Sequence, residues 1–216
     1  MAAMTPAVAT PSAERVKAAC EKFDHEHELI EHSLEELVRQ YPHNIDPRHI
    51  LLKVVAVNAL EHTHIFAIDA VARHIHTDIE NIDKAMASGS PEVINQIAKV
   101  AIHGKKYNLY SFATKYCSLH NPQAYPVYDL RVDHYLCRLQ AQHPFTAFHH
   151  AELCDYGEFV AIMTAFRDFH RLGSFSFQEI GKFIHLQDEP PVLPLQEEIQ
   201  IGPGAFDFFP AQELPS

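Results

Sequence analysis

Helical spacing of apolar residues runs through most of this chain and constrains its fold more than any other feature. Large apolar side chains recur at intervals of three and four residues between residues 12 and 187, which places them on one face of an α-helix. No convincing run alternates apolar and polar residues, as a half-buried strand would. The sequence therefore predicts an all-α fold, a helical bundle in one domain over residues 12–187.

The two ends of the chain differ in composition from this region. Residues 1–11 are mostly Ala, Thr and Pro, which cannot form a core and predict a disordered lead. Residues 188–216 are rich in Pro and acidic side chains and predict an extended C-terminal tail. Phe206, Phe208 and Phe209 are the side chains that could strap this tail to the body.

Capping residues and prolines divide the domain into predicted helices. A helix that begins at Ser12 ends before Pro42, and Asp46-Pro47 begins a second helix. The second helix is apolar nearly all the way round, so we expect it at the middle of the core. Further helices are predicted over residues 65–75, 79–86 and 155–172, and from Ser176, which has capping-box spacing. The helix over 155–172 is expected to direct Phe159, Ile162, Met163, Phe166 and Phe169 inward.

The segment from about residue 90 to 140 has an unusual organisation. A helix begins at Ser90-Pro91 and is expected to run to Gly104, followed by a short basic turn and a second helix. The apolar stripe of the second helix leaves three polar residues together on the opposite face: Ser111, Lys115 and Ser118. This face is expected to meet polar surroundings.

A proline-bounded connector follows the second helix. Pro122 and Pro126 exclude helix there, because proline lacks the amide hydrogen and favours extended geometry in the preceding residue. Helical spacing resumes at Val132, which puts Asp129 at or next to the N-cap of a third helix. An ordinary N-cap is one interpretation of Asp129, and a functional carboxylate is the other.

This segment thus has a helix, a short hairpin, a second helix and a connector that ends in Tyr125-Pro126-Val127-Tyr128-Asp129. This order resembles the helix-hairpin-helix DNA glycosylases, most closely the 8-oxoguanine DNA glycosylase-like proteins. The resemblance implies a helix-hairpin-helix bundle that cleaves the N-glycosidic bond of a modified or damaged base. It also implies that Asp129 activates the nucleophile and stabilises the positive sugar. DNA is the implied partner, and no cofactor is expected.

Two positions depart from the family pattern. Bifunctional members carry a nucleophilic lysine on the second helix, where the usual spacing gives Ser111 in this sequence. Water is therefore the expected nucleophile, and lyase activity is expected only if Lys115, one turn further on, reaches the cleft; otherwise Lys115 is an ordinary solvated lysine. The family hairpin also uses two glycines to approach a phosphate, and those places fall near Tyr107 and Leu109 here.

Residues in and beside the hairpin are the candidates for DNA contact. The basic ones suit phosphate groups, and the aromatic ones suit a flipped base, although each has a structural alternative as a solvated loop or core side chain. The candidates are His103, Lys105, Lys106, Tyr107, Asn108, Tyr110 and Tyr128.

The overall charge argues against extensive non-specific binding to DNA. Seventeen basic residues against 28 acidic ones give a formal charge of −11, whereas such binding depends on Lys and Arg. Four scattered cysteines without a CxxC pair predict free thiols in a reducing cytoplasm and argue against zinc bound through cysteine. No segment has the apolar length of a membrane span, so a soluble cytoplasmic protein is expected.

Clustered histidines suggest a different chemistry. His62, His64, His74 and His76 lie close together in the sequence, and metal ligands often occur in such groups. On a helix, however, an HxH pair points about 200° apart, so no metal site is predicted and surface histidines are the expected account. Three hypotheses follow: a DNA glycosylase, a catalytically silent helical module that binds nucleic acid or protein, and a histidine-rich metal-dependent hydrolase.

Overall fold

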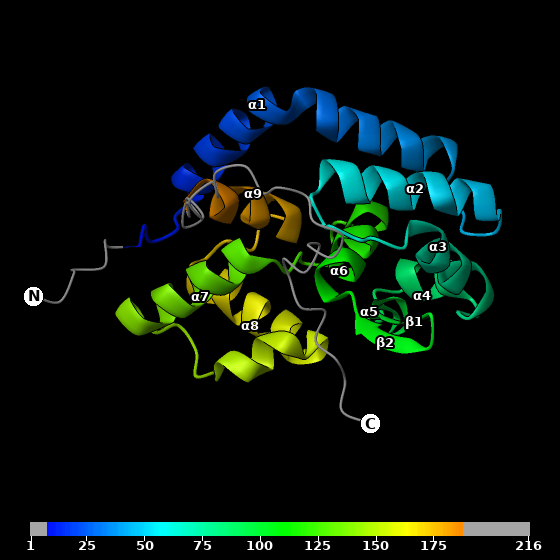
Figure 1. The fold of residues 1–216 in the computed structure, drawn as a ribbon. Helices are drawn as coiled ribbons and strands as arrows, with labels where there is room; N and C mark the ends of the chain where they lie inside the picture. The colour runs from blue at the N-terminus through cyan, green and yellow to red at the C-terminus, as the bar shows by residue number, and fades with distance from the viewer. Residues whose placement is uncertain (1–7, 188–216) are drawn as a thin grey trace, which may run out of the picture.

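The computed structural model describes residues 8–187. This part of the chain is mostly helical (Figure 1), with two short strands and one turn of 3-10 helix, η1. The helices are α1 (Ala13–Gln40), α2 (Pro47–Leu60), α3 (Ile68–Thr77), α4 (Ile82–Ala87), α5 (Glu92–Ala98), α6 (Tyr110–His120), α7 (Leu130–Gln142), α8 (Tyr156–Phe169) and α9 (Phe177–Gln187), and the remaining elements are β1 (Lys99–Ile102), β2 (Lys105–Asn108) and η1 (His150–Cys154).

The helices form two groups that the long helix α1 spans (Figure 1). The first half of α1 lies over α9, and its second half lies over α2. Helices α7, α8 and α9 gather on one side, and α2 to α6 with the two strands gather on the other. One continuous hydrophobic core joins the groups, and the connector between α6 and α7 passes from one to the other. The N-terminus of α7 therefore lies where the groups meet.

The predicted helix starts are confirmed by their capping hydrogen bonds. The side chain of Ser12 accepts from the backbone of α1, and that of Asp46 accepts from the backbone of α2. Ser176 and Glu179 form the reciprocal bonds of a capping box at α9: Ser176 Oγ accepts from the Glu179 amide at 3.1 Å, and Glu179 Oε2 accepts from the Ser176 amide at 2.7 Å. These local signals sit in the sequence itself, which is why they could be recognised.

Two predictions about burial are wrong. Helix α2 is not surrounded by core, because Leu52 and Val55 are 49% and 43% exposed. Only the face of α2 that carries Ile50, Val54 and Val57 is buried. Phe169, predicted to point inward from α8, is 57% exposed because the helix ends there.

The segment between α5 and α6 also differs from the prediction. The first helix does not continue to Gly104 but ends at Ala98, and an antiparallel pair of strands follows. Val100 and Ile102 face the core while Lys99 and Ala101 are exposed, so a period of two is present after all, over four residues. His103 and Gly104 form the turn with positive φ of 52° and 80°, as two-residue hairpins require. A β-hairpin therefore stands where a helix-hairpin-helix loop was expected.

The start of the described chain packs against α7. Val8 is buried, and its amide donates to Gln142 Oε1 at 2.9 Å. The Ala9 carbonyl accepts from the Tyr135 hydroxyl at 3.0 Å. Residues 8–11 of the predicted lead are thus held in place, whereas residues 1–7 and the predicted tail lie outside the described residues. No helix in the described part is long and apolar enough to cross a lipid bilayer.

Candidate functional site

The connector that carries Asp129 is fixed at several points. The Tyr125 hydroxyl donates to the carbonyls of Ala85 and Ser90, both at 3.1 Å, and the Tyr156 hydroxyl donates to the Pro126 carbonyl at 3.0 Å. These tyrosines are buried, so their hydrogen bonds are shielded from water. The backbone that leads to Asp129 is therefore held in place by hydrogen bonds, and it is not helical, as its prolines predicted.

A close approach between two loops also restrains this backbone. Gly89 has a φ of +71°, and a Cβ built there would lie 3.0 Å from Cβ of Ala124 in the connector. The Tyr128 amide donates to Thr114 Oγ1 at 3.1 Å, which ties the end of the connector to α6. This hydrogen bond thus holds Asp129 beside the middle of α6.

Asp129 is the N-cap of α7, as predicted. Its Oδ1 accepts from the amides of Arg131 and Val132, each at 3.0 Å. The second oxygen, Oδ2, points to Lys115 on α6, whose Nζ is 3.8 Å away. The two oxygens of this carboxylate therefore have different partners, one within its own helix and one across the fold.

Lys115 is enclosed rather than solvated, since its side chain is only 11% exposed. Its Nζ donates to the Glu61 carbonyl at 2.8 Å and lies 3.7 Å from Glu61 Oε2. Glu61 is the C-cap of α2 and directly follows its last residue. Three elements, the end of α2, the middle of α6 and the start of α7, thus bring one ammonium group between two carboxylates. We call Glu61, Lys115 and Asp129 the central triad.

The other predicted residues of the polar face do not join this triad. Ser118 is buried, with 7% exposure, instead of facing polar surroundings. Ser111 is half-buried one turn before Lys115, and its carbonyl accepts from the Thr114 hydroxyl. Of the three residues predicted on this face, only Lys115 therefore reaches Asp129.

Charged and titratable groups border the triad. Burial raises the pKa of Glu61, and the Lys115 ammonium opposes that rise. Burial and the Arg131 guanidinium lower the pKa of His185 on α9 to about 4. A neutral His185 can accept the hydrogen bond from Arg131 Nη1, whose distance to Nε2 is 2.7 Å. The start of α7 is therefore also tied to α9.

Neither Glu61 nor His185 was predicted as a residue of this site. Glu61 lies 54 positions before Lys115 in the sequence, and His185 lies 54 positions after Arg131. Local spacing contains no signal for pairings across such separations. Their proximity follows from how α2, α6, α7 and α9 pack.

The predicted DNA contacts separate into two sets. His103, Lys105 and Lys106 are exposed at the turn of the β-hairpin. Tyr107 is half-buried with its ring 5.3 Å from that of Phe66, and Asn108 at the end of β2 is also half-buried. The basic candidates of the hairpin are therefore at the surface, and the other two are partly covered.

Tyr110 and Tyr128 belong instead to an aromatic cluster inside the fold. Their ring centroids are 4.9 Å apart. The Tyr110 hydroxyl donates to the Leu153 carbonyl at 3.2 Å, and the Tyr128 hydroxyl donates to Asp133 Oδ2 at 2.7 Å. Both rings thus have the contacts of core residues with a polar end.

Two surface hollows in the described part of the chain lie away from the triad. One of about 260 Å³ is lined mainly by α3 and α5, and another of about 570 Å³ lies along α1. Neither is lined by Lys115 or Asp129. The triad therefore lies outside these two hollows, at the junction between the helix groups.

The predicted histidine clusters form no metal-binding group among residues 8–187. His62 and His64 lie in a loop with positive φ of 51° and 55°, and their ring centroids are 6.5 Å apart. On α3, His74 Nδ1 is 2.9 Å from Asp78 Oδ2, and its Nε2 is 2.7 Å from the Gln96 carbonyl. Within the described residues, the group with suitable ligand atoms lies elsewhere, at Asp133, Cys137 and His150.

Comparisons with known proteins give a family match and a similar protein. A family model described as HI_0787_N, N-terminal domain, matches residues 15–124. A protein of Haemophilus influenzae (strain ATCC 51907 / DSM 11121 / KW20 / Rd), described as uncharacterized, is 41% identical over 113 residues, which are 52% of this chain and 56% of that relative. No solved structure gives a significant match. The region matched by the family model includes Glu61 and Lys115 but ends before Asp129.

Proposed function

This chain belongs to the HI_0787_N family, and we propose that it is a DNA glycosylase-like enzyme that cleaves the bond between a modified base and its sugar. The observation that carries the proposal is the distance of 3.8 Å between Lys115 Nζ and Asp129 Oδ2. This pair combines an amine nucleophile with a carboxylate at the end of a rigid connector, where two groups of helices meet.

Asp129 would act on the sugar. Its Oδ1 is held by two amides of α7, so the side chain is oriented before any substrate arrives. When the N-glycosidic bond breaks, its electron pair leaves with the base, and positive charge develops on the sugar. A preorganised carboxylate stabilises that charge more than water does, because it need not reorient during the reaction.

Lys115 would supply the nucleophile. The ammonium must first lose a proton, and the carboxylate of Glu61, 3.7 Å away, is placed to accept it because its raised pKa makes it a stronger base than an exposed glutamate. Nζ then bonds to the anomeric carbon as the bond to the base breaks, and the base leaves with that electron pair and takes the proton held by Glu61. Nζ next gives up a second proton, its lone pair displaces the ring oxygen from the anomeric carbon, and the ring oxygen takes up that proton. The product is a protonated imine, the intermediate that leads to strand cleavage. If Lys115 instead stays on the Glu61 carbonyl, water attacks and the enzyme releases the base without cutting the strand.

DNA would approach over the β-hairpin. His103, Lys105 and Lys106 are exposed there and suit phosphate oxygens, which attract cations whatever the base sequence. The hairpin leads directly into α6, where Lys115 lies about 8 Å beyond the helix start at 1.5 Å per residue. A flipped base would then enter the junction of the two helix groups, which has to open to admit it.

A catalytically silent binding module is the second candidate. It is favoured by the hydrogen bond of 2.8 Å that occupies Lys115 Nζ and by the β-hairpin that stands where a helix-hairpin-helix loop was expected. In that case Lys115 joins α6 to the end of α2, and the exposed hairpin recognises a partner without chemistry.

Incubation with a panel of duplex and single-stranded oligonucleotides, each carrying one modified base, tests the proposal. The expected product is an abasic site, and borohydride reduction is expected to trap a covalent adduct through Lys115. Lys115→Gln should abolish the adduct, and Asp129→Asn should abolish base release. Lys182→Gln is the matched control, since Lys182 is similarly enclosed at 15% exposure and also lies between two carboxylates.

The outcomes separate the candidates. Base release without a trapped adduct would assign the attack to water. Binding of DNA without base release from any oligonucleotide would support the silent module. Adduct formation that persists in Lys115→Gln would contradict the role given to this lysine.

A further inference from the structure

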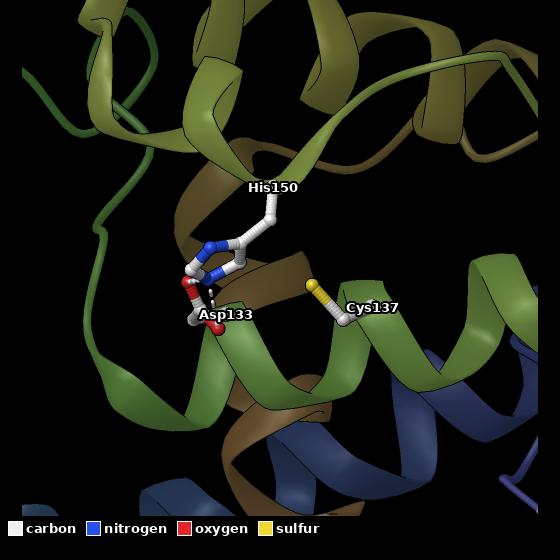
Figure 2. Close-up of side chains that lie close together, drawn as sticks. All are labelled: Asp133, Cys137 and His150. Carbon is white, nitrogen blue, oxygen red and sulfur yellow. Dashed lines mark hydrogen bonds and ion pairs between the residues drawn. The ribbon is translucent and has the colours of Figure 1, made fainter.

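A second group of side chains lies outside the central triad, between α7 and the segment that precedes α8. Asp133 and Cys137 are one helical turn apart on α7, and His150 begins η1. One ligand atom from each residue lies within 4.8 Å of the other two. Figure 2 shows the imidazole of His150 directed at the Asp133 carboxylate, with the Cys137 sulfur one turn along α7. We propose that these three residues bind a zinc ion, with water in the fourth position.

The ligand types select zinc from the common biological cations. Mg²⁺ and Ca²⁺ prefer oxygen ligands, whereas a sulfur, an imidazole nitrogen and a carboxylate oxygen form a set typical of Zn²⁺. A thiolate and a carboxylate together balance the charge of the ion, and neutral imidazole adds none. The complex is therefore electrically neutral, which suits the partly buried position of Cys137.

The carboxylate of the group is already oriented. Asp133 is only 7% exposed, and its Oδ2 accepts a hydrogen bond of 2.7 Å from the Tyr128 hydroxyl. The Tyr128 amide is in turn bound to Thr114. Hydrogen bonds to ligating groups fix their direction and commonly raise metal affinity about 10- to 100-fold. The Tyr128 hydroxyl, which a phenylalanine would lack, therefore orients the proposed carboxylate ligand.

The imidazole supplies the adjustment that binding needs. Its Nε2 is 2.9 Å from Asp133 Oδ2, and the His150 side chain is 66% exposed. Zinc bonds of about 2.0–2.3 Å require neighbouring ligand atoms to lie roughly 3.3–3.7 Å apart in a tetrahedron. If the Cys137 sulfur lies at the upper limit of 4.8 Å from another ligand atom, it has to move about 1 Å closer to that atom to reach the tetrahedral separation. The exposed imidazole of His150 can move to make room for the ion. The exposed side also admits water as the fourth ligand.

Zinc at this position would join two segments that are otherwise separate in sequence. His150 follows α7 by a loop and precedes α8, so the ion would fasten that loop to the first two turns of α7. This role does not depend on the proposed glycosylase activity, because the ligands are distinct from Glu61, Lys115 and Asp129.

Titration of the metal-free protein with zinc and with cobalt, which reports thiolate coordination by its charge-transfer absorption, tests the site. The expected result is one tightly bound ion per chain, a cobalt–thiolate band, and a higher melting temperature with zinc. Cys137→Ser should remove the band. Both Cys137→Ser and His150→Gln should weaken zinc binding by about 100-fold, since losing a ligand costs at least as much as losing an outer hydrogen bond.

Matched controls separate this site from the other histidines and thiols. Cys20 is also a partly buried free cysteine, and His143 is also exposed near the end of α7. Cys20→Ser and His143→Gln should bind zinc as the wild type does. Absence of a thiolate band in the wild type, its persistence in Cys137→Ser, or equal weakening in the controls would each overturn the proposal.

Discussion

Substitutions of Asp129 separate the contributions that its two carboxylate oxygens make to the free energy of unfolding. Oδ1 caps α7 through two amides at 3.0 Å, and loss of such a cap costs about 1 kcal/mol, with a range of about 0.5–2. Oδ2 faces Lys115 at 3.8 Å, where the two side chains are 24% and 11% exposed; a pair of this kind contributes about 0.5–1 kcal/mol. Asp129→Ala should therefore lower the free energy of unfolding by about 1.5–2 kcal/mol.

Two further variants divide that loss. Asp129→Ser keeps a capping oxygen and should lose only about 0.5–1 kcal/mol, the contribution of the ion pair. Asp155 caps α8 through the amides of Gly157 and Glu158, and within residues 8–187 its carboxylate forms no ion pair with a lysine. Asp155→Ala is therefore the matched control and should lose about 1 kcal/mol from the cap alone.

Urea unfolding at pH 7, followed by circular dichroism, measures these differences, provided that the dependence on urea stays constant among the variants. Equal losses in Asp129→Ala and Asp129→Ser would refute the capping account. Equal losses in Asp129→Ala and Asp155→Ala would show that the approach of Lys115 contributes nothing to stability.

Three other predictions concern the core and its protonation. Burial lowers the pKa of His120 to about 3, below its value of about 6.5 in the unfolded chain. The contribution of the neutral His120 side chain to stability is therefore complete above pH 6.5. This contribution is lost as the pH falls from 6.5 towards 3. Between pH 7 and pH 5 the wild type should lose about 2 kcal/mol more than His120→Phe in urea unfolding. Phe159→Ala should cost about 3–5 kcal/mol because that ring is fully buried, whereas Phe169→Ala should cost less than about 1 kcal/mol in the same assay. On α2, Leu52→Gln should change stability by less than about 0.5 kcal/mol and Val54→Ala by about 2 kcal/mol, and similar losses would contradict the one-sided burial of that helix.

The helices were predictable because their signals are local. The N-caps Ser12 and Asp46, the capping box at Ser176 and the N-cap Asp129 each bond within two or three residues. Position in the core was less predictable, since it depends on neighbours distant in sequence. Leu52 and Val55 have the composition of a buried helix but lie on the outer side of α2.

The site was predictable only in part. The proline-bounded connector identified Asp129, and the helical spacing put Lys115 on the same face of α6 as Ser111. The contact between Lys115 and Asp129, however, depends on how the connector crosses α6, and Glu61 joins them from α2. The β-hairpin escaped prediction because four residues of alternation, Lys99 to Ile102, are too short to stand out from a helical pattern.

The structural and functional interpretations of Asp129 do not exclude each other. Capping by Oδ1 fixes the side chain, and a fixed side chain is what electrostatic stabilisation by Oδ2 requires. A variant that destroys the cap therefore cannot show whether the second oxygen has a chemical role. Asp129→Asn is the informative change, because an amide can keep the capping oxygen while it replaces the negative charge beside Lys115. Loss of base release in a variant that unfolds at nearly the wild-type urea concentration would assign the chemistry to that charge and not to the stability of α7.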